Sequence, residues 1–391
     1  MASIHQLLKP MVLTKAVSWV AAASDHILRF MGFEPGGFNE EFLGHGRVGE
    51  FNVFNNIRTI GLGRAPATAA GKSAKQAMSQ VPFVYPRMHD SVDISAEFFH
   101  NLSKINNQAA RDIAGEDMIS RQTNILGQKA ANWRIAMTVG MLRDGLFLQQ
   151  LGDDWFWTYA SGSETNAVTV AQVNFQMPAG NKSQLNMTDR ASTSIFSGDI
   201  IDVSWDNRNA DIPLHIKKIN EARERVGIGP LTDIHLGSQL WNHVSQNDVV
   251  SSQAGISNPP FETFHRESGT RADGSPIHEM IGRINSAPGV EWHISDAGLE
   301  LGEPGSETFT KHWETNNAVF MGSPRVNGNF SLMQGSEPIA EFDGGPETVR
   351  VGLSSWSVKK ANPTVTELYV LDNALTVNHD GFSVAYGTVV F

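Results

Sequence analysis

The chain has 391 residues, a net charge of −11 and 40% hydrophobic residues, a composition typical of a globular protein with a large buried core. It contains no cysteine, which excludes disulfide bonds, thiolate catalysis and cysteine-ligated zinc. The negative charge argues against a protein that coats nucleic acid by itself, and the 36 glycines and 17 prolines argue against an all-helical fold.

The first fifty residues are expected to form an arm without a core of its own. The apolar run at 16–24 is too short to span a bilayer. It predicts a short helix with Thr14 as N-cap and apolar residues to Met31, followed by Gly32 just past its end. A signal peptide is the alternative, because basic residues precede this run.

An extended β-hairpin is predicted next. Strand-like runs lie at 50–62 and 81–99, and small and polar residues separate them. Between Glu50 and Asp90 there is no acidic residue, so this segment is strongly basic. Its basic residues are candidates for contact with an acidic surface on another copy of the chain: Arg58, Arg64, Lys72, Lys75 and Arg87.

The hairpin also contains the tail of a phosphate-binding loop, Gly71-Lys72-Ser73. The full motif requires a glycine where this chain has Pro66, and proline offers no N–H to a phosphate. A flexible surface loop is therefore expected here, and no nucleotide or other cofactor is predicted.

A helix of about forty residues is predicted from Lys104 to Arg143. At about 1.5 Å per residue it would span about 60 Å, more than one small domain needs, so it is expected to act as a spine. Its internal glycines favour kinks. Apolar residues recur at mostly helical spacing: Ile105, Ala109, Ile113, Ile125, Trp133, Met137 and Met141.

Three carboxylates near the start of this helix are candidate contact residues. Asp112 and Glu116 are four residues apart and share one helix face, and Asp117 adjoins them. Two carboxylates can serve acid–base chemistry, form a solvated face or bind cations. The separate basic hairpin favours a docking face.

The second half of the chain alternates strands with two helices. A hairpin is predicted around Gly152-Asp153-Asp154. Asp211 or the loop before it is expected to cap a helix that ends at 227–231 and has an apolar face of Ile212, Ile216, Ile219 and Val226. A short buried strand follows, and then a helix with Ser238 as N-cap. Residues 259–298 read as helix-poor and loop-rich, and three further strands are expected, within 317–326, 367–379 and 381–391.

No motif indicates catalysis or metal binding. There are 13 histidines but no H-E-x-x-H pair, and no G-x-S-x-G element occurs. His235 and His243 are eight residues apart across a strand–helix junction, which is not ligand spacing. We expect them to be hydrogen-bonded structural histidines, and we predict no catalytic, cofactor or metal residues.

The order of parts resembles the major capsid proteins of tailed bacteriophages, specifically the lambda-type capsid family, over roughly 45–391. The most specific match is residues 205–250: an Asp-led helix, a Gly-Pro break, a short strand and a helix bearing Leu-Trp. The chain has Trp205-Asp206-Asn207 where relatives often have Trp-Ser-Asp. The stretch 160–204 is longer than the resemblance leads us to expect.

The resemblance implies an α+β fold with five parts. They are an N-terminal arm (1–50), an extended hairpin loop (51–98), a peripheral domain with spine helix and sheet (99–204), an inserted axial domain (205–328) and a return to the peripheral sheet (329–391).

The resemblance implies a structural role without catalysis. Such a protein self-assembles, as hexamers and pentamers, into an icosahedral shell that encloses the viral DNA genome without binding it specifically. It would be assembled in the host bacterial cytoplasm, without a membrane, and would be found in the virion. A portal is an expected partner, and so is a separate scaffolding protein, because no large N-terminal helical segment is present. Some relatives form Lys–Asn crosslinks and others recruit a decoration protein, and the sequence supports neither.

Two other functions stay open. The same fold can form the shell of a non-viral protein compartment, which the sequence separates poorly from a capsid. The second is an enzyme whose active site has no recognisable motif, which would need a pocket with perturbed carboxylates or histidines.

Overall fold

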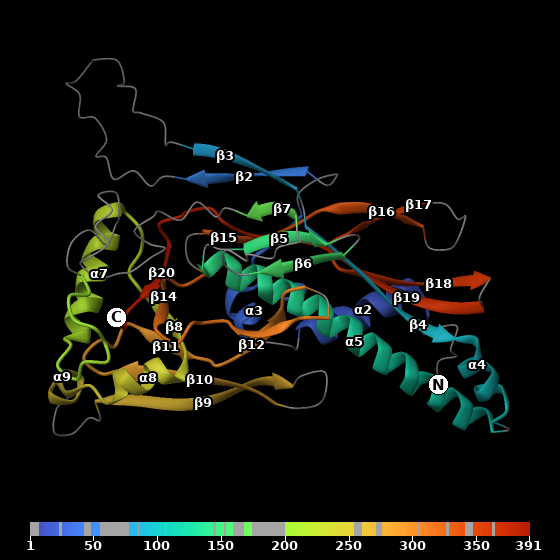
Figure 1. Ribbon diagram of the computed structural model, residues 1–391, viewed down its shortest axis with the longest axis horizontal. Helices are drawn as coiled ribbons and strands as arrows, with labels where there is room; N and C mark the ends of the chain where they lie inside the picture. The colour runs from blue at the N-terminus through green and yellow to red at the C-terminus, as the bar shows by residue number, and fades with distance from the viewer. Residues whose placement is uncertain are drawn as a thin grey trace, which may run out of the picture.

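A computed structural model (Figure 1) describes residues 8–22, 26–42, 48–54, 78–84, 86–105, 107–143, 146–151, 154–158, 168–173, 200–253, 260–270, 276–303, 305–325, 328–340, 347–361 and 364–391. Helices and both parallel and antiparallel strand pairs are present, so the predicted α+β class is confirmed. Among these residues no helix combines the length and the apolar character that crossing a membrane requires.

The arm contains α2, α3 and β1, which span Pro10–Ala22, His26–Met31 and Glu40–Phe42. The prediction of Thr14 as N-cap was wrong, because α2 begins at Pro10, a residue suited to the first helical position. Thr14 instead bonds a distant strand: its Oγ1 donates to Ser355 O at 3.0 Å and accepts from Ser355 N at 2.9 Å. Gly32 ends α3 in the left-handed region, with φ of 70°.

The hairpin consists of β2 and β3, which span Val48–Phe54 and Met78–Val84 and pair antiparallel. It lies at the outer edge of the molecule in Figure 1. Four of the basic contact candidates, Arg58, Arg64, Lys72 and Lys75, lie outside the described residues.

The single strand predicted at 81–99 is two strands in the structure, because β3 ends at Val84 and the next strand begins at Arg87. β4 spans Arg87–Ser95, and α4, Ala96–Ser103, follows it directly. The hydroxyl of Ser95 accepts a hydrogen bond from Phe98 N at 3.4 Å and so caps α4. The backbone changes from strand to helix at this cap. The apolar pattern continues past it, which is why the sequence predicted a strand as far as Phe99.

The long helix is confirmed as α5, Gln108–Arg143, with 36 residues. Gly127 serves close packing, since a Cβ there would lie 2.7 Å from Val20 Cβ on α2. Ile113 and Ile125, predicted on the buried face, are 54% and 46% exposed. The prediction failed because different elements cover α5 along its length: Ile119 to Ala131 pack beside α2, whereas Ile135 to Leu142 pack beside α3, β15 and β19.

The first sheet is built around the long strand β19, Thr364–Asn378. One end of β19 pairs with β4 and β18, the other end pairs with β15, and β1 adds parallel to β15. β18 and β15 span Ser354–Ala361 and Phe330–Gln334. β16 and β17, Ser336–Ala340 and Glu347–Val351, form a separate hairpin.

A small three-stranded sheet follows α5 in the chain. β5 and β6 form the predicted hairpin, and β7 pairs with the other edge of β5. The three strands span Leu146–Leu151, Asp154–Thr158 and Val168–Val173.

The second large sheet has the order β20-β14-β8-β11-β10-β9. The expectation of a loop-rich segment at 259–298 was wrong, because β9, β10 and β11 lie there, at Phe261–Thr270, Pro276–Ile284 and Glu291–Ile294. β9 is an edge strand, and its polar sequence gives no apolar alternation. β12 and β13, Gly298–Leu301 and Thr308–Lys311, form a further hairpin.

Helices α7, α8 and α9, at Ile212–Val226, Ser238–Ser245 and Asp248–Ser252, accompany this sheet. As predicted, Asp211 caps α7, its Oδ1 accepting from Leu214 N at 3.0 Å, and Gly227 closes the helix with φ of 90°. The cap of α8 is Gly237 rather than the predicted Ser238, which is already helical.

The inserted segment and the chain end share one sheet. β8 and β14, Asp233–Leu236 and Asn317–Met321, are the buried strands that the sequence predicted. β20, Val384–Thr388, pairs with β14. The sequence places all of 329–391 in the peripheral sheet, and in the structure β15, β18 and β19 lie there whereas β20 lies in the other large sheet.

Candidate assembly surface

The acidic residues predicted as a docking face lie on α5. Glu116 and Asp117 are exposed and Asp112 is half-buried; we call these three the acidic patch. Asp117 forms an ion pair with Arg121 at 2.8 Å, with both side chains mostly exposed, so this pair is worth at most about 1 kcal/mol. The patch therefore offers negative charge to solvent in a single copy of the chain.

The described member of the basic set, Arg87, is engaged within its own chain. Its Nε lies 2.9 Å from Oε2 of Glu337 on β16, whose side chain is 2% exposed. The Arg87 side chain keeps 39% of its surface exposed, so a contact with a neighbouring copy stays a prediction.

Large apolar side chains on two packed helices face solvent. Met11 and Trp19 on α2 are 80% and 74% exposed, and Ile113 and Ile125 on α5 are about half exposed. Sequence periodicity assigned Ile113 and Ile125 to the core and so missed them as surface residues. Exposed large apolar side chains mark interaction surfaces where they form a contiguous patch.

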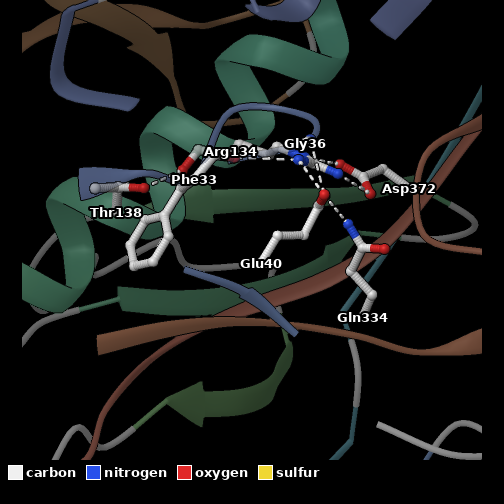
Figure 2. A network of polar contacts seen from close by, with 7 residues as sticks. All are labelled: Phe33, Gly36, Glu40, Arg134, Thr138, Gln334 and Asp372. Carbon is white, nitrogen blue, oxygen red and sulfur yellow. Dashed lines mark hydrogen bonds and ion pairs between the residues drawn. The ribbon is translucent and has the colours of Figure 1, made fainter. Parts of the chain in front are cut away.

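A buried arginine network ties the arm to the body (Figure 2). Arg134 on α5 is fully buried, and its Nε and Nη2 donate to the two carboxylate oxygens of Asp372 on β19, at 2.6 and 3.2 Å. Its Nη1 donates to Phe33 O at 3.1 Å and to Glu40 Oε1 at 3.4 Å. One guanidinium thus joins α5, β19 and the arm.

The network extends through Glu40 and Thr138. Glu40 accepts from Gly36 N at 2.8 Å and from the side-chain amide of Gln334, and Thr138 Oγ1 donates to Arg134 O at 2.8 Å. Burial alone would lower the pKa of Arg134, but the charge of Asp372 and its hydrogen bonds reverse this and raise the pKa above its ordinary value. Arg134 lies within the mostly apolar segment Ala131 to Val139. A charged residue in such a segment is the signal from which its burial could have been predicted.

A histidine junction connects α3 to the second large sheet. His235 on β8 and His293 on β11 are paired in register and stack with ring centroids 4.5 Å apart. Phe30 of α3 contacts both rings, at 4.9 and 4.7 Å, and Trp313 contacts His235 at 5.7 Å.

The expectation that His235 is hydrogen-bonded was wrong. It is fully buried, and neither ring nitrogen has a hydrogen-bond partner among the residues that the structure describes. Burial, with the neighbouring His293 and His26 adding to it, holds the pKa of His235 well below 6.5. His235 is therefore neutral and packs as an aromatic ring.

Three residues near this junction could hold a metal ion. The ligand atoms of Asp233, Glu291 and His293 lie within 4.8 Å of one another. In the structure His293 Nε2 donates to Asp233 Oδ1 at 2.9 Å, and Glu291 pairs with Arg283. A metal would have to displace both interactions, so the group is satisfied by the protein's own charges as it stands.

Two histidines with polar partners can be compared with the histidine of a catalytic triad. His215 Nε2 donates to Asp202 Oδ1 at 2.8 Å, but its Nδ1 accepts from the indole Nε1 of Trp205 at 3.1 Å, where a catalytic triad would place a hydroxyl or thiol. The pair therefore orients the fully buried Trp205 in the core of the inserted segment.

The second arrangement joins Ser331 to His379. His379 Nδ1 donates to the carbonyl of Asn52 on β2 at 2.8 Å, so its Nε2 accepts from the Ser331 hydroxyl at 2.5 Å. Ser331 has no exposed surface, and a substrate could not reach it. This contact fastens the hairpin strand β2 to the body.

No family model and no curated protein sequence matches the chain. Solved structures are similar along most of its length. A putative capsid protein of a prophage in E. coli CFT073 is 12% identical, with 80% of each chain covered and a TM-score of 0.43. The capsid of Ralstonia phage GP4 is 11% identical, covering 95% of this chain and 92% of that one, with a TM-score of 0.45. An encapsulin complex from Synechococcus elongatus PCC 7942 is 11% identical, covering 90% and 85%, with a TM-score of 0.37.

Proposed function

We propose that this chain is the repeating subunit of a closed icosahedral shell that encloses DNA, a major capsid protein. The observation that carries the proposal is the exposure of large apolar side chains on two helices: Met11 and Trp19 on α2, and Ile113 and Ile125 on α5, which also bears the acidic patch. A monomer gains nothing from exposing this combination, whereas repeated copies would bury it at their contacts.

The order of elements along the chain supports a shell subunit. An arm, a hairpin, a long helix, a sheet and an inserted segment with its own sheet follow one another, and the chain then returns to the first sheet. This is the order on which the family resemblance of the sequence rests. α5 runs across the molecule and carries the arm on one side (Figure 1), as a spine helix would.

We infer that the basic hairpin lies across the acidic patch of a neighbouring copy. The segment 51–89 has no acidic residue, and the acidic patch faces solvent on α5. Opposite charges at separate places on one chain favour head-to-tail contacts, which close into rings of subunits.

The proposed partners follow from the shell. Copies of the chain would form hexamers and pentamers, with a portal and a separate scaffolding protein, and the shell would become part of the virion after assembly in the bacterial cytoplasm. A subunit with a net charge of −11 would enclose DNA without binding it tightly.

We propose that the chain has no catalytic activity. The two histidine arrangements in the described residues support this, because one orients a tryptophan and the other holds a fully buried serine.

Electron microscopy of the purified protein, produced with and without a scaffolding protein, tests the shell. We expect closed particles of uniform diameter. A monodisperse monomer under every assembly condition would refute the proposal, and particles containing a protein cargo instead of DNA would assign the chain to a non-viral compartment.

Charge reversal tests the proposed docking of hairpin on helix. Lys72→Glu with Lys75→Glu should reduce assembly while circular dichroism of the isolated chain stays unchanged. Adding Glu116→Lys and Asp117→Lys to the same chain should restore assembly, because the pair is then reversed on both sides. The control is Lys217→Glu, an exposed lysine on α7, which should assemble normally. Failure of the fourfold variant to assemble better than the double variant would refute this contact.

A further inference from the structure

A second buried arginine in this chain lacks the partner that the first one has. Arg223, near the end of α7, is 2% exposed, as buried as Arg134. Arg134 has the carboxylate of Asp372 against its guanidinium. Arg223 forms no ion pair with any described residue, and its bonds go to two carbonyl oxygens: Nε donates to Gly229 O at 3.0 Å and Nη1 to Ser383 O at 2.9 Å.

The positive charge of Arg223 is only partly compensated. Asp380 acts on it through space, without contact, and the carbonyl end of α7 lies beside it. Burial lowers the pKa of Arg223 to about 10, so the group stays protonated at neutral pH. A buried cation without a paired anion is costly, and an anion that binds beside it would relieve this cost.

Arg223 lines a cavity of about 130 Å³, and so does Gly322, the residue beside its remaining nitrogen, Nη2. A Cβ at position 322 would lie 3.1 Å from Nη2, so Gly322 leaves the space in front of this nitrogen open. In the described part of the chain Nη2 meets no acceptor. The cavity lies where α7, the end of β14 and the starts of β15 and β20 meet.

Other polar groups line the same cavity. Ser323 and Asn329 carry a hydroxyl and an amide that donate to no acceptor among the described residues, and both line the cavity with Arg223. Three donors from three segments thus line one cavity. The cavity has room for a small tetrahedral oxyanion.

We propose that this cavity binds a small oxyanion of the phosphate type, held by Arg223, Ser323 and Asn329. Guanidinium nitrogens form strong, charge-assisted hydrogen bonds to phosphate oxygens. The bound anion would contact residues that precede β15 and residues of the inserted segment, and so would stabilise the junction between the two large sheets.

Calorimetric titration of the full chain with sodium phosphate, at constant ionic strength against sodium chloride, tests the site. We expect phosphate to bind with one-to-one stoichiometry and to raise the midpoint of thermal unfolding as its concentration rises, and chloride to do neither. Asn329→Ala should weaken binding about tenfold, as expected for the loss of one hydrogen bond to a charged group.

Two further variants test the same site: Gly322→Ala should block it, and Asn242→Ala is the control. Gly322→Ala places a methyl group against Nη2 and should also weaken binding at least about tenfold, by excluding an oxygen atom from this position. Asn242→Ala, at an exposed position on α8, is the matched control and should bind like the wild type. Equal responses to phosphate and chloride would overturn the proposal. So would phosphate binding that Asn329→Ala leaves unchanged, and because Asn329 is only half-buried this variant stays informative if Gly322→Ala misfolds.

Discussion

Replacing Arg134 with methionine should destabilise the protein strongly and release the arm. The substitution keeps much of the side-chain volume but leaves Asp372, which has no exposed surface, as an uncompensated buried charge. Loss of one partner of a buried pair costs about 3–5 kcal/mol. The carbonyl of Phe33 also loses its donor, which adds about 1 kcal/mol or more.

A second substitution separates the cost of the unpaired buried charge from the cost of the lost packing and hydrogen bonds. In Arg134→Met with Asp372→Leu no buried charge remains at this pair, so most of the loss should be recovered, leaving about 1–3 kcal/mol for the unpaired groups of the arm. Because Asp372→Leu alone also leaves a buried charge unpaired, the two sites should show a coupling energy of at least about 3 kcal/mol in a double-mutant cycle. Lys129→Met is the control on the same helix, because it breaks an exposed pair with Asp90 and should cost less than about 1 kcal/mol.

Urea unfolding followed by tryptophan fluorescence measures these free energies. Limited proteolysis measures the arm, and residues 33–40 should be cut faster in Arg134→Met than in the control, because Phe33 and Glu40 lose their contact with α5. A cost below about 1 kcal/mol for Arg134→Met, or strictly additive effects in the cycle, would refute the reasoning.

Three further predictions follow from the packing, the histidine junction and the surface. Gly127→Ala should lower the free energy of unfolding in urea by about 1–3 kcal/mol, because the new methyl group meets Val20 and this outweighs the better helix propensity of alanine. The control Ser120→Ala, on the exposed face of α5, should be neutral or slightly stabilising. The pKa of His235 in the folded chain lies well below 6.5, so as the pH falls the unfolded chain binds a proton at this residue before the folded chain does. The free energy of unfolding should therefore decrease below about pH 6.5, by up to about 1.4 kcal/mol per pH unit. Unfolding curves of His235→Leu should lack this contribution. Trp19→Ser should change the unfolding free energy by less than about 0.5 kcal/mol but reduce particle formation in electron microscopy; normal particle yield would remove α2 from the proposed contacts.

Local signals in the sequence predicted the inserted segment best. Asp211 and Gly227 mark the two ends of α7 by side-chain and backbone chemistry that acts within a few residues, and both ends were found correctly. The strand at 317–321 was found because both of its faces are buried, which leaves a continuous apolar run.

Features that depend on distant partners could not be predicted. Thr14 is a good cap residue in isolation, yet its hydroxyl bonds Ser355, more than three hundred residues away. Ile113 and Ile125 have the period of a buried stripe, but the elements that cover α5 change along its length. The acidic patch was identified as a cluster of like charges, and the exposed apolar residues of α2 and α5 were not identified.

The placement of β20 has a consequence for how the chain folds. β14 lies between β8 and β20, so the inserted segment cannot complete its sheet until a strand from beyond β19 has been added. The sheet therefore depends on pairings between residues far apart in sequence, which form slowly. A fragment ending before β20 would expose the edge of β14, with its buried Val319 and Phe320, and would be prone to aggregate. The two large sheets should accordingly unfold as one cooperative unit, and excising the inserted segment should yield an insoluble fragment rather than an independent domain.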